Sequence, residues 1–453
     1  MASYDVHVGL VGAGIGGLAA AIALRRAGAR VTVLEAASSL GEIGAGIQMT
    51  PNVSRLLRAW SVSDIIGDNL VRMEEINMRR KDGTKVGHTP MQRVESTLGQ
   101  PWWVVHRAHL HHGLVEVAKT EGAVVLIDSK VAHLNQKTQN RVEVRTTKGI
   151  NHTFDLVIGS DGINSVVRKV IHPEARPRPP TGNAAYRAIV PYDQIRKDPV
   201  ARVLIEKPTM EVWMAEGSYI ITYPISAGKD LNMVLSHQRP EMVTTVEEVD
   251  MEDLRATYED YDPRIKRVVD MIPYAQRWPL LVTGPLETWS TPSRRVVLIG
   301  DAAHSMTNHM AQGAATSMED GAFLAKCVGQ VIQGNMSIND AVELYERERM
   351  PKAYVKQQVS FLNGAIWQLP EGPMQTSRDE AMAPELEGKP MLRSPNLYGD
   401  PATVLEVYGY DAEAHAEQAI EAFLLEQDAP SDPKPGVSKP LEEKYLNWFL
   451  PDQ

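Results

Sequence analysis

Three glycine-rich segments, each directly after a short apolar run, constrain the fold of this chain more than any other feature. They are residues 11–17 (VGAGIGG), 159–162 (GSDG) and 300–304 (GDAAH). The apolar runs before them have the length and composition of buried strands, so each glycine segment is expected at the end of a strand. Three such loops in one chain predict an α/β fold in which separate segments surround a single ligand.

The first segment has the spacing of a dinucleotide-binding turn. Gly12 permits a tight turn after the strand, Gly14 lets the backbone approach a pyrophosphate, and Gly17 lets the next helix pack on the sheet. The alanine-rich helix expected over 18–27 would begin with free N–H groups facing the phosphates. The alternative is a glycine-rich turn that holds no ligand.

Glu35 supports the ligand-binding interpretation. It ends a second apolar run, 29–34, and lies 23 positions after Gly12 (35 − 12 = 23), near the spacing of about 20 typical of dinucleotide folds. A carboxylate here accepts hydrogen bonds from ribose hydroxyls and repels a 2′-phosphate. The site is therefore predicted to bind FAD or NAD and not NADP, and the three glycine segments together indicate FAD.

Composition excludes several classes of function. The chain has 453 residues, 43% hydrophobic and 23% charged, with a formal net charge of −10, and this size allows two or three domains. It has no long basic run, so nucleic acid is not an expected partner, and no apolar run of 18 residues, so no membrane span is expected. The single cysteine, Cys327, excludes an internal disulfide, and no histidine has a partner at ligand spacing, so no metal site is expected. The start of the chain leads into a strand without a targeting leader, which together with one cysteine favours a cytoplasmic protein.

The region 181–282 is rich in short β-type segments and predicts an inserted sheet that forms a wall for a substrate. The strands expected there are 203–205, 211–214, 219–223 and 231–235. Before this region, the loop 41–48 carries three glycines, including Gly46, which indicates either backbone close to a ligand or a plain connection.

Three further predictions concern the rest of the chain. An antiparallel ribbon is expected over 131–134 and 142–146, with Lys148-Gly149 as its turn. Helices are expected after Gln312 and over 337–354. The stretch 370–440 contains many Pro, Gly and Glu residues and is expected to be irregular except for a helix over 413–425.

These motifs resemble those of the single-component FAD-dependent aromatic hydroxylases, which include salicylate hydroxylase, 3-hydroxybenzoate 6-hydroxylase and 6-hydroxynicotinate 3-monooxygenase. The resemblance runs from residue 5 to about 360 and is most specific where the third glycine segment continues into 310–314 (MAQGA) and Glu319-Asp320. A second, short region of resemblance is found at 407–411 (VYGYD). The resemblance implies a Rossmann-like FAD-binding domain with an inserted β-rich substrate domain and a helical C-terminal region.

The resemblance also implies domain boundaries. They are 1–75, 101–180 and 285–360 for the FAD-binding domain, 76–100 and 181–284 for the substrate domain, and 361–453 for the C-terminal region.

Cofactor-binding residues follow from the same resemblance. Asp301 would bind the ribityl chain of FAD, Gly313 and Ala314 would offer backbone N–H groups to the flavin ring, and Arg107 would reach the pyrophosphate or ribityl region. Asp161 is associated with FAD and the nicotinamide donor in this family. It is equally suited to cap the helix that begins near residue 163, and a cap is the alternative for Asp301 as well.

Four residues are candidates for catalysis. Arg187 would stabilise a phenolate or carboxylate, with a domain-bridging salt bridge as the alternative, and Tyr223 would donate a hydrogen bond, with a core tyrosine as the alternative. Tyr219 stands where several bacterial relatives have a histidine, and it shares a strand face with Tyr223. His309 is a weaker candidate expected to border the flavin, with a solvated or supporting histidine as the alternative. Ser305 replaces a proline that is common in the family, so the pocket floor is expected to differ.

The implied activity is a monooxygenase reaction in which NADH or NADPH reduces FAD and O₂ forms a flavin C4a-hydroperoxide that hydroxylates a phenolic acid. Salicylate-like oxidative decarboxylation is the leading form expected. The first alternative is tailoring of a polyketide or prenylated phenol, as in fungal members. Two others are an FAD oxidase or dehydrogenase that never forms the hydroperoxide, and a non-catalytic FAD-binding protein. Expected partners are a small aromatic substrate and O₂, and the protein is expected to be a monomer or homodimer.

Overall fold

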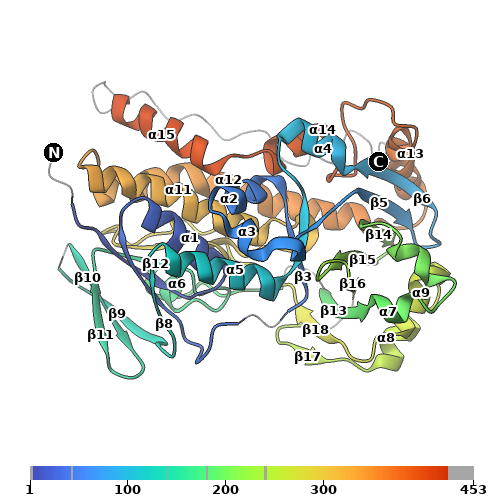
Figure 1. Ribbon diagram of the computed structural model, residues 1–453, viewed down its shortest axis with the longest axis horizontal. Helices are drawn as coiled ribbons and strands as arrows, with labels where there is room; N and C mark the ends of the chain where they lie inside the picture. Colours follow the sequence, from blue (N-terminus) through green and yellow to red (C-terminus); the bar gives the residue numbers. More distant parts are fainter. Residues whose placement is uncertain (1–3, 42–43, 139, 180–181, 239–241, 427–453) are drawn as a thin grey trace.

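A five-stranded parallel sheet places all three glycine segments at one edge. We analysed a computed structural model that describes residues 4–41, 44–138, 140–179, 182–238 and 242–426 (Figure 1). The sheet has the order β19-β12-β1-β2-β8, with the bounds β19 (Val296–Leu298), β12 (Leu156–Gly159), β1 (His7–Val11), β2 (Arg30–Leu34) and β8 (Val124–Leu126). The three strands that end in glycine segments are neighbours, since Val11 lies opposite Gly159 and Gly159 opposite Leu298. The predicted Rossmann-like arrangement is confirmed.

Two helices that start at this edge pack tightly against each other. They are α1 (Ile15–Arg26) and α11 (Gly313–Gln333). A Cβ atom on Gly321 would lie 2.8 Å from the Cα of Ala20, and one on Gly16 would lie 2.8 Å from the Cβ of Ser317. Glycine at these contacts lets the helix axes approach, so the N-termini of both helices open on the same space.

The inserted strands form a second, eight-stranded sheet with the order β17-β18-β13-β16-β15-β14-β5-β6 (Figure 1). The bounds are β17 (Glu247–Glu248), β18 (Gln276–Pro279), β13 (Asn183–Pro191), β16 (Asp230–Gln238), β15 (Ser218–Ile225), β14 (Thr209–Ala215), β5 (Glu75–Arg80) and β6 (Lys85–Pro90). The early strand β5 pairs in parallel with β14, so segments 76–100 and 181–284 contribute to one sheet. The exact domain boundaries stay a prediction.

Smaller elements connect these two sheets. They are β3 (Gly46–Met49), α2 (Pro51–Ala59), α3 (Val62–Ile66), β4 (Val71–Arg72), α4 (Met91–Leu98), β7 (Trp103–His106), α5 (Arg107–Thr120), α6 (Val166–Ile171), α7 (Tyr192–Ile195), α8 (Met251–Thr257), α9 (Pro263–Asp270) and α10 (Asp301–His304). The strands β3, β7 and β4 form a separate antiparallel sheet beside the edge of the parallel sheet that carries the glycine segments.

Two local predictions were wrong. The expected strand 203–205 lies in a 3₁₀ turn, Ala201–Ile205, because the carboxylate of Asp198 accepts the N–H groups of Val200 and Ala201 and starts a helical turn. Lys148-Gly149 does not close the first ribbon but joins its second strand to a third. That sheet consists of β9 (Val131–Thr138), β10 (Arg141–Thr146) and β11 (Asn151–Phe154).

The C-terminal region is more helical than its composition predicts. The helix α12 (Ile338–Trp367) extends well past residue 354, and α13 (Pro373–Leu386) fills part of the stretch expected to be irregular. Pro373 occupies the first position of α13, where the missing N–H costs nothing, so this proline starts a helix. The helix expected over 413–425 is confirmed as α15 (Ala412–Glu426), and α14 (Pro401–Thr403) is a short turn before it.

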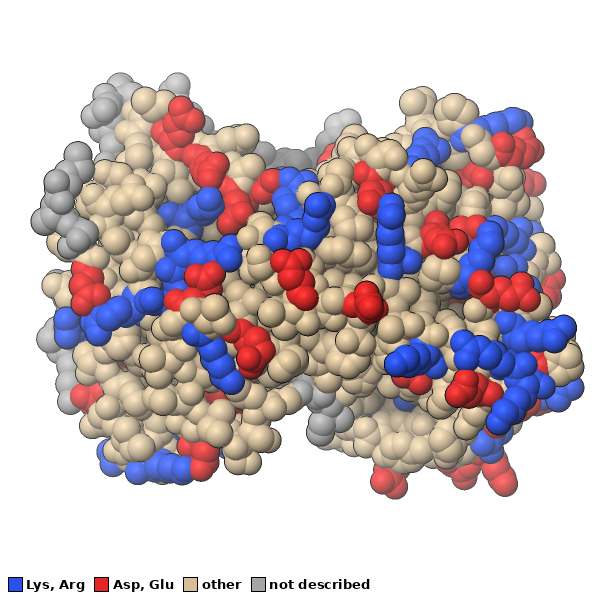
Figure 2. Space-filling model, viewed as in Figure 1, with Lys and Arg blue, Asp and Glu red and all other residues tan. Residues whose placement is uncertain are grey.

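The surface shows no dominant charge of one sign on the face in Figure 2, where lysine and arginine side chains alternate with aspartate and glutamate. Among the described residues, no helix is long and apolar enough to cross a membrane. Within the same residues, no group of three or more histidine, cysteine or carboxylate side chains is arranged to hold a metal ion.

Candidate active site

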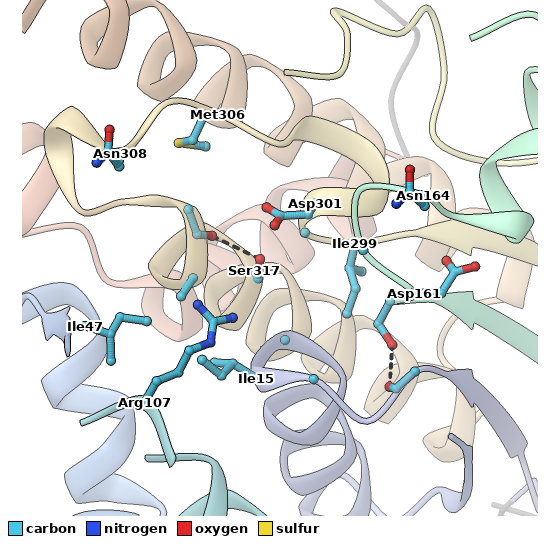
Figure 3. A pocket seen from close by; sticks show the side chains of 18 of the residues that line it. Ile15, Ile47, Arg107, Asp161, Asn164, Ile299, Asp301, Met306, Asn308 and Ser317 are labelled. Atoms are coloured by element: carbon cyan, nitrogen blue, oxygen red, sulfur yellow. Dashed lines mark hydrogen bonds between the residues drawn. The ribbon is translucent and has the colours of Figure 1, made fainter. Parts of the chain in front are cut away.

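A cavity of about 600 Å³ lies at the carboxyl edge of the parallel sheet, between that sheet and the eight-stranded sheet. All three glycine segments contribute to its wall, together with side chains from β13, β15 and β16. Figure 3 shows Arg107, from the start of α5, and Asp301 and Asn308, from the segment after β19, around the same space. One end has the character of a dinucleotide site and the other that of a small-molecule site.

The glycines of the first segment serve different purposes. Gly12 has φ +102°, and a Cβ there would lie 2.7 Å from the carbonyl oxygen of Ser160, so only glycine fits. A Cβ on Gly14 would meet no atom within 4 Å, which leaves its backbone open to the cavity. Gly17 does not line the cavity; its Cβ would lie 2.2 Å from the carbonyl oxygen of Gly12, so it allows helix α1 to pack on the turn.

Glu35 directly follows β2 and lines the cavity. Its two carboxylate oxygens accept hydrogen bonds from the backbone N–H groups of Ala13 and Ala37, both at 2.7 Å. Each carboxylate oxygen has more than one acceptor position, so Glu35 can hold the glycine turn and still accept a ribose hydroxyl.

Asp161 caps a helix, which is one of the two interpretations left open by the sequence. Its carboxylate accepts the N–H groups of Val166 (2.7 Å) and Val167 (3.2 Å) at the start of α6, and the hydroxyl of Ser165. Burial raises the pKa of this carboxyl above its usual range. Asp161 also lines the cavity, and its contact with a cofactor stays a prediction.

The central part of the cavity suits a flavin. The first N–H groups of α11, those of Gly313 and Ala314, have no acceptor among the described residues and open on the cavity. The carboxylate of Asp301, at the start of α10, makes no hydrogen bond or ion pair within the described part of the chain. Unpaired helix N–H groups beside a free carboxylate match a ring that carries negative charge and a hydroxylated chain. The residues present therefore fit FAD.

Arg107 and Gly46 complete the cofactor end of the cavity. Arg107 begins α5, and its guanidinium points into the cavity toward α11 (Figure 3). Gly46 lines the wall at the start of β3, where this strand contacts the eight-stranded sheet. A Cβ on Gly46 would lie 2.5 Å from the ring of Tyr223, and its N–H donates to Asn232 Oδ1 at 2.6 Å. These close neighbours are protein side chains, and the predicted approach of the Gly46 backbone to a ligand stays a prediction.

A buried polar network holds the start of α11, and sequence reasoning did not find it. Glu319 accepts hydrogen bonds from Asn52 (2.6 Å), Lys356 (2.6 Å) and Arg349 (2.8 Å), all nearly inaccessible to solvent. Gln312, just before α11, donates to Thr50 Oγ1 at 3.0 Å. Tyr410 belongs to the short region of resemblance at 407–411, and its ring covers Arg349 and Lys356. The ring centroid lies 5.1 Å from the Arg349 guanidinium and 5.5 Å from Lys356 Nζ.

Arg187 and Tyr223 both lie on the wall opposite the cofactor edge. Arg187, Val234 and Ile221 are direct cross-strand neighbours on β13, β16 and β15, so their side chains face the same side. The Arg187 guanidinium stacks on Trp278, 5.2 Å from the ring centroid. Burial raises the pKa of Tyr223 above its ordinary value, and the nearby Arg187 opposes this shift, so Tyr223 stays a hydrogen-bond donor at neutral pH.

Tyr219 and His309 lie behind the wall rather than on it. Tyr219 shares the face of Tyr223, as predicted, but it is fully buried and packs edge-on against His309 and Trp367, at 5.3 and 5.4 Å between ring centroids. Burial raises the pKa of Tyr219 to about 12 and lowers the pKa of His309 to about 4. Neither ring nitrogen of His309 has a hydrogen-bond partner among the described residues. Their predicted catalytic roles remain predictions, and this placement limits both to acting through a neighbour.

That neighbour is Asn308, which sequence reasoning missed. Asn308 lines the cavity beside Met306 and Thr307, and its Oδ1 accepts the hydroxyl of Tyr219 at 3.3 Å. Its NH₂ group and the second acceptor position of its oxygen remain for the cavity. The only sequence signal for Asn308 was its position between Asp301 and Gly313, because its hydrogen-bond partner Tyr219 lies 89 residues away in sequence.

Comparisons with known proteins agree with this site. A family model described as an FAD binding domain matches residues 5–360. An FAD-dependent monooxygenase (OpS4) of Beauveria bassiana is 31% identical over 92% of this chain and 97% of that protein. A 3-hydroxybenzoate 6-hydroxylase of Polaromonas naphthalenivorans is 33% identical over 77% of this chain and 84% of that protein.

A solved structure confirms the fold independently. A salicylate hydroxylase in a substrate complex superposes with a TM-score of 0.74 at 21% identity, covering 92% of this chain and 97% of that one. The motifs, the cavity and the match over most of the chain lead to one conclusion: this protein belongs to the FAD-dependent aromatic hydroxylases and is a flavoprotein monooxygenase.

Proposed function

We propose that this protein hydroxylates a phenolic, hydroxybenzoate-type aromatic with NADH or NADPH and O₂ as co-substrates. The observation that carries the proposal is the pair Arg187 and Tyr223 on the cavity wall that faces the start of α11. A cation and a hydroxyl donor on an otherwise apolar wall of Ile221 and Val234 suit a flat ring that bears an anionic oxygen. The match to a 3-hydroxybenzoate 6-hydroxylase supports this substrate class.

The protein's part in this reaction is to bind, orient and activate the phenol. Bound FAD supplies reduction by the nicotinamide and the activation of O₂. A free phenol has a pKa near about 10, so a neighbouring guanidinium is needed to favour the more nucleophilic phenolate. Arg187, held flat on Trp278, supplies that charge, and Tyr223 donates a hydrogen bond to the same oxygen. Ile221, Val234 and Met306 keep water from this part of the cavity.

Two variants of the activity follow from the same wall. If Arg187 holds a carboxylate on the carbon that is attacked, hydroxylation releases CO₂, as proposed for a salicylate-like substrate. The second candidate is tailoring of a larger phenol such as a polyketide. The match to the FAD-dependent monooxygenase of Beauveria bassiana favours it, because that match covers 92% of this chain, against 77% for the 3-hydroxybenzoate 6-hydroxylase.

The decisive experiment is oxidation of NADH and of NADPH by the FAD-loaded protein, with and without 3-hydroxybenzoate, salicylate and a set of polyketide phenols. Product mass, CO₂ and H₂O₂ are followed together. Stimulated oxidation with gain of one oxygen supports hydroxylation, and CO₂ release supports the decarboxylating form. Stimulation that yields only H₂O₂ identifies a ring that binds in the wrong position. No stimulation by any phenol contradicts the proposal.

We also propose that the enzyme is cytoplasmic and is a monomer or homodimer. The cytoplasmic location is supported by Cys327, the single thiol of the chain. Cys327 is fully buried, and burial raises its pKa far above the ordinary value. Size-exclusion chromatography with light scattering tests the oligomeric state.

A further inference from the structure

A second cavity of about 510 Å³ lies outside the active site, among β6, α4, the end of α13 and the segment around α14. These elements gather at one end of the molecule in Figure 1. Val94 and Val404 form part of its wall, and His88, Arg93 and Lys389 add polar groups. We call this cavity the C-terminal groove.

Exposed apolar side chains surround this groove. Leu405 and Leu386 line it and are 58% and 45% exposed, and Leu392, next to the lining residue Met391, is 92% exposed. Apolar side chains that cluster at a concave surface mark a binding site, whereas scattered ones need no explanation. The groove therefore has the character of a docking surface.

The chain itself carries a segment suited to it. In residues 441–450 (LEEKYLNWFL), apolar side chains recur at Leu441, Tyr445, Trp448 and Phe449, the spacing of one helix face. Residues 427–440, which precede it, hold four prolines among polar residues, a composition typical of an extended linker. An apolar stripe at the end of a linker needs a surface to cover it.

We propose that residues 441–450 dock in the C-terminal groove of their own chain. The reach is sufficient: α15 has 15 residues, so it is about 22 Å long, and the residues from Leu405 to its start at Ala412 span at most about 25 Å. The 14 linker residues from 427 to 440 span roughly 43–50 Å when extended, which matches the longest return path.

The lining carries charges of both signs. Arg93 and Lys389 line the groove, but so do Glu385 and Glu387, and Lys389 pairs with Glu387. Charge therefore does not select the occupant, which is selected by the apolar stripe and by the length of the linker before it.

Docking would stabilise the loop that carries Asn308, on the side facing away from the cavity. The groove-lining residues Val404 and Leu405 belong to the segment that also carries Tyr398 and Tyr408. The hydroxyl of Tyr398 donates to the carbonyl of His309 at 3.1 Å, and that of Tyr408 to the carbonyl of Met310 at 3.5 Å. The groove floor is thus tied to the loop that carries Asn308.

Cross-linking in the full chain tests the proposal, because the buried Cys327 leaves no competing accessible thiol. The double variant Thr97→Cys with Lys444→Cys is treated with a short bismaleimide. We expect an intramolecular cross-link, identified by peptide mass, at least about tenfold more abundant than in the control pair Ser129→Cys with Lys444→Cys. Ser129 is partly exposed and follows β8, at the other end of the molecule in Figure 1. Equal yields in the two pairs, or links only between two copies, overturn the proposal.

Hydrogen exchange provides a second test that needs no engineered thiol. Tyr445→Asp with Phe449→Asp places charges on the apolar stripe, whereas Asn447→Asp places a charge off it. We expect amides of 88–98 and 385–405 to exchange at least about tenfold faster in the first variant and at an unchanged rate in the control. Equal exchange in both variants contradicts docking at this groove.

Discussion

At the residue scale, the side chains on the cavity wall differ from those that support it. Arg187 and Tyr223 face the space where a substrate would lie, while Tyr219 and His309 stand one layer behind and contact it through Asn308. Substitutions in the first group are expected to change the reaction, and those in the second to change stability and the position of the loop. Two predictions separate these effects.

Arg187→Ala is expected to lower kcat/KM for a phenolic substrate by about 10²- to 10³-fold, because the variant loses the cation that we propose stabilises the phenolate. Steady-state kinetics measure this loss, and flavin absorbance confirms that FAD content is unchanged. Arg196→Ala is the matched control, since Arg196 also stacks on an aromatic ring, that of Tyr192, but lies outside the cavity. An equal loss in both variants would mean that Arg187 acts only through folding.

His309 is expected to make the folded state sensitive to acid. Its folded pKa of about 4 lies below the unfolded value of 6.5, so the unfolded state binds more protons between these pH values and stability falls as pH drops. The free energy of unfolding should be about 2 kcal/mol lower at pH 5 than at pH 7 from this residue alone. Denaturant unfolding of His309→Gln should lack this part of the loss, whereas His133→Gln, at an exposed position, should keep it.

At the element scale, the helix α11 carries both the N–H groups that open on the cavity and the carboxylates that fix its position. Glu319 and Asp320 lie two turns in from Gly313 and are buried with Arg349, Lys356 and His304. Burial without partners would raise the pKa of Asp320, but His304 and Arg349 lower it below the ordinary value, so the carboxylate stays charged. The network thereby holds α11 in one orientation relative to the sheet.

Lys356→Met is expected to destabilise the protein by about 3–5 kcal/mol, because Glu319 then remains buried with too little compensating charge. Chemical denaturation measures the change. Lys326→Met is the matched control on α11 itself: Lys326 pairs with Glu417 at 2.7 Å on the surface, and its loss should cost less than about 1 kcal/mol. Similar costs for the two variants would show that the buried network does not carry this stability.

At the scale of the whole molecule, the cofactor-binding part and the eight-stranded sheet meet at Gly46, the first residue of β3. The Gly46 N–H donates to Asn232 on the eight-stranded sheet, and its missing side chain leaves room for the ring of Tyr223. This contact sets the distance between the cofactor edge and the substrate wall. Reactions that depend on placing a ring against a flavin should therefore be sensitive to it.

Gly46→Ala is expected to separate substrate binding from hydroxylation. The added Cβ would lie 2.5 Å from Tyr223, so the wall must shift, and more of the NAD(P)H consumed should appear as H₂O₂ instead of product. The ratio of peroxide to hydroxylated product measures this uncoupling. Gly41→Ala, in the same loop but with no atom within 4 Å of the new Cβ, should leave the ratio unchanged.

Much of the fold and of the cofactor site could be predicted from local sequence. Gly12, Gly14, Glu35, Asp301 and Gly313 all line one cavity, because the turn after each parallel strand is encoded within a few residues of it. The local sequence pattern also predicted the helix α15 correctly. The strand predicted at 203–205 was wrong, because the carboxylate of Asp198 favours a helical turn there.

Only the tertiary structure decided which residues of the strands and loops reach the substrate. Alternation along β15 places Tyr219 and Tyr223 on one face, but it does not say how far along the strand the cavity extends. The function of Asn308 depends on Tyr219, and the hold on α11 depends on Asn52 and Lys356, partners brought from distant parts of the chain. Backbone turns are determined by neighbouring residues, whereas burial and charge pairing depend on the packing of whole elements.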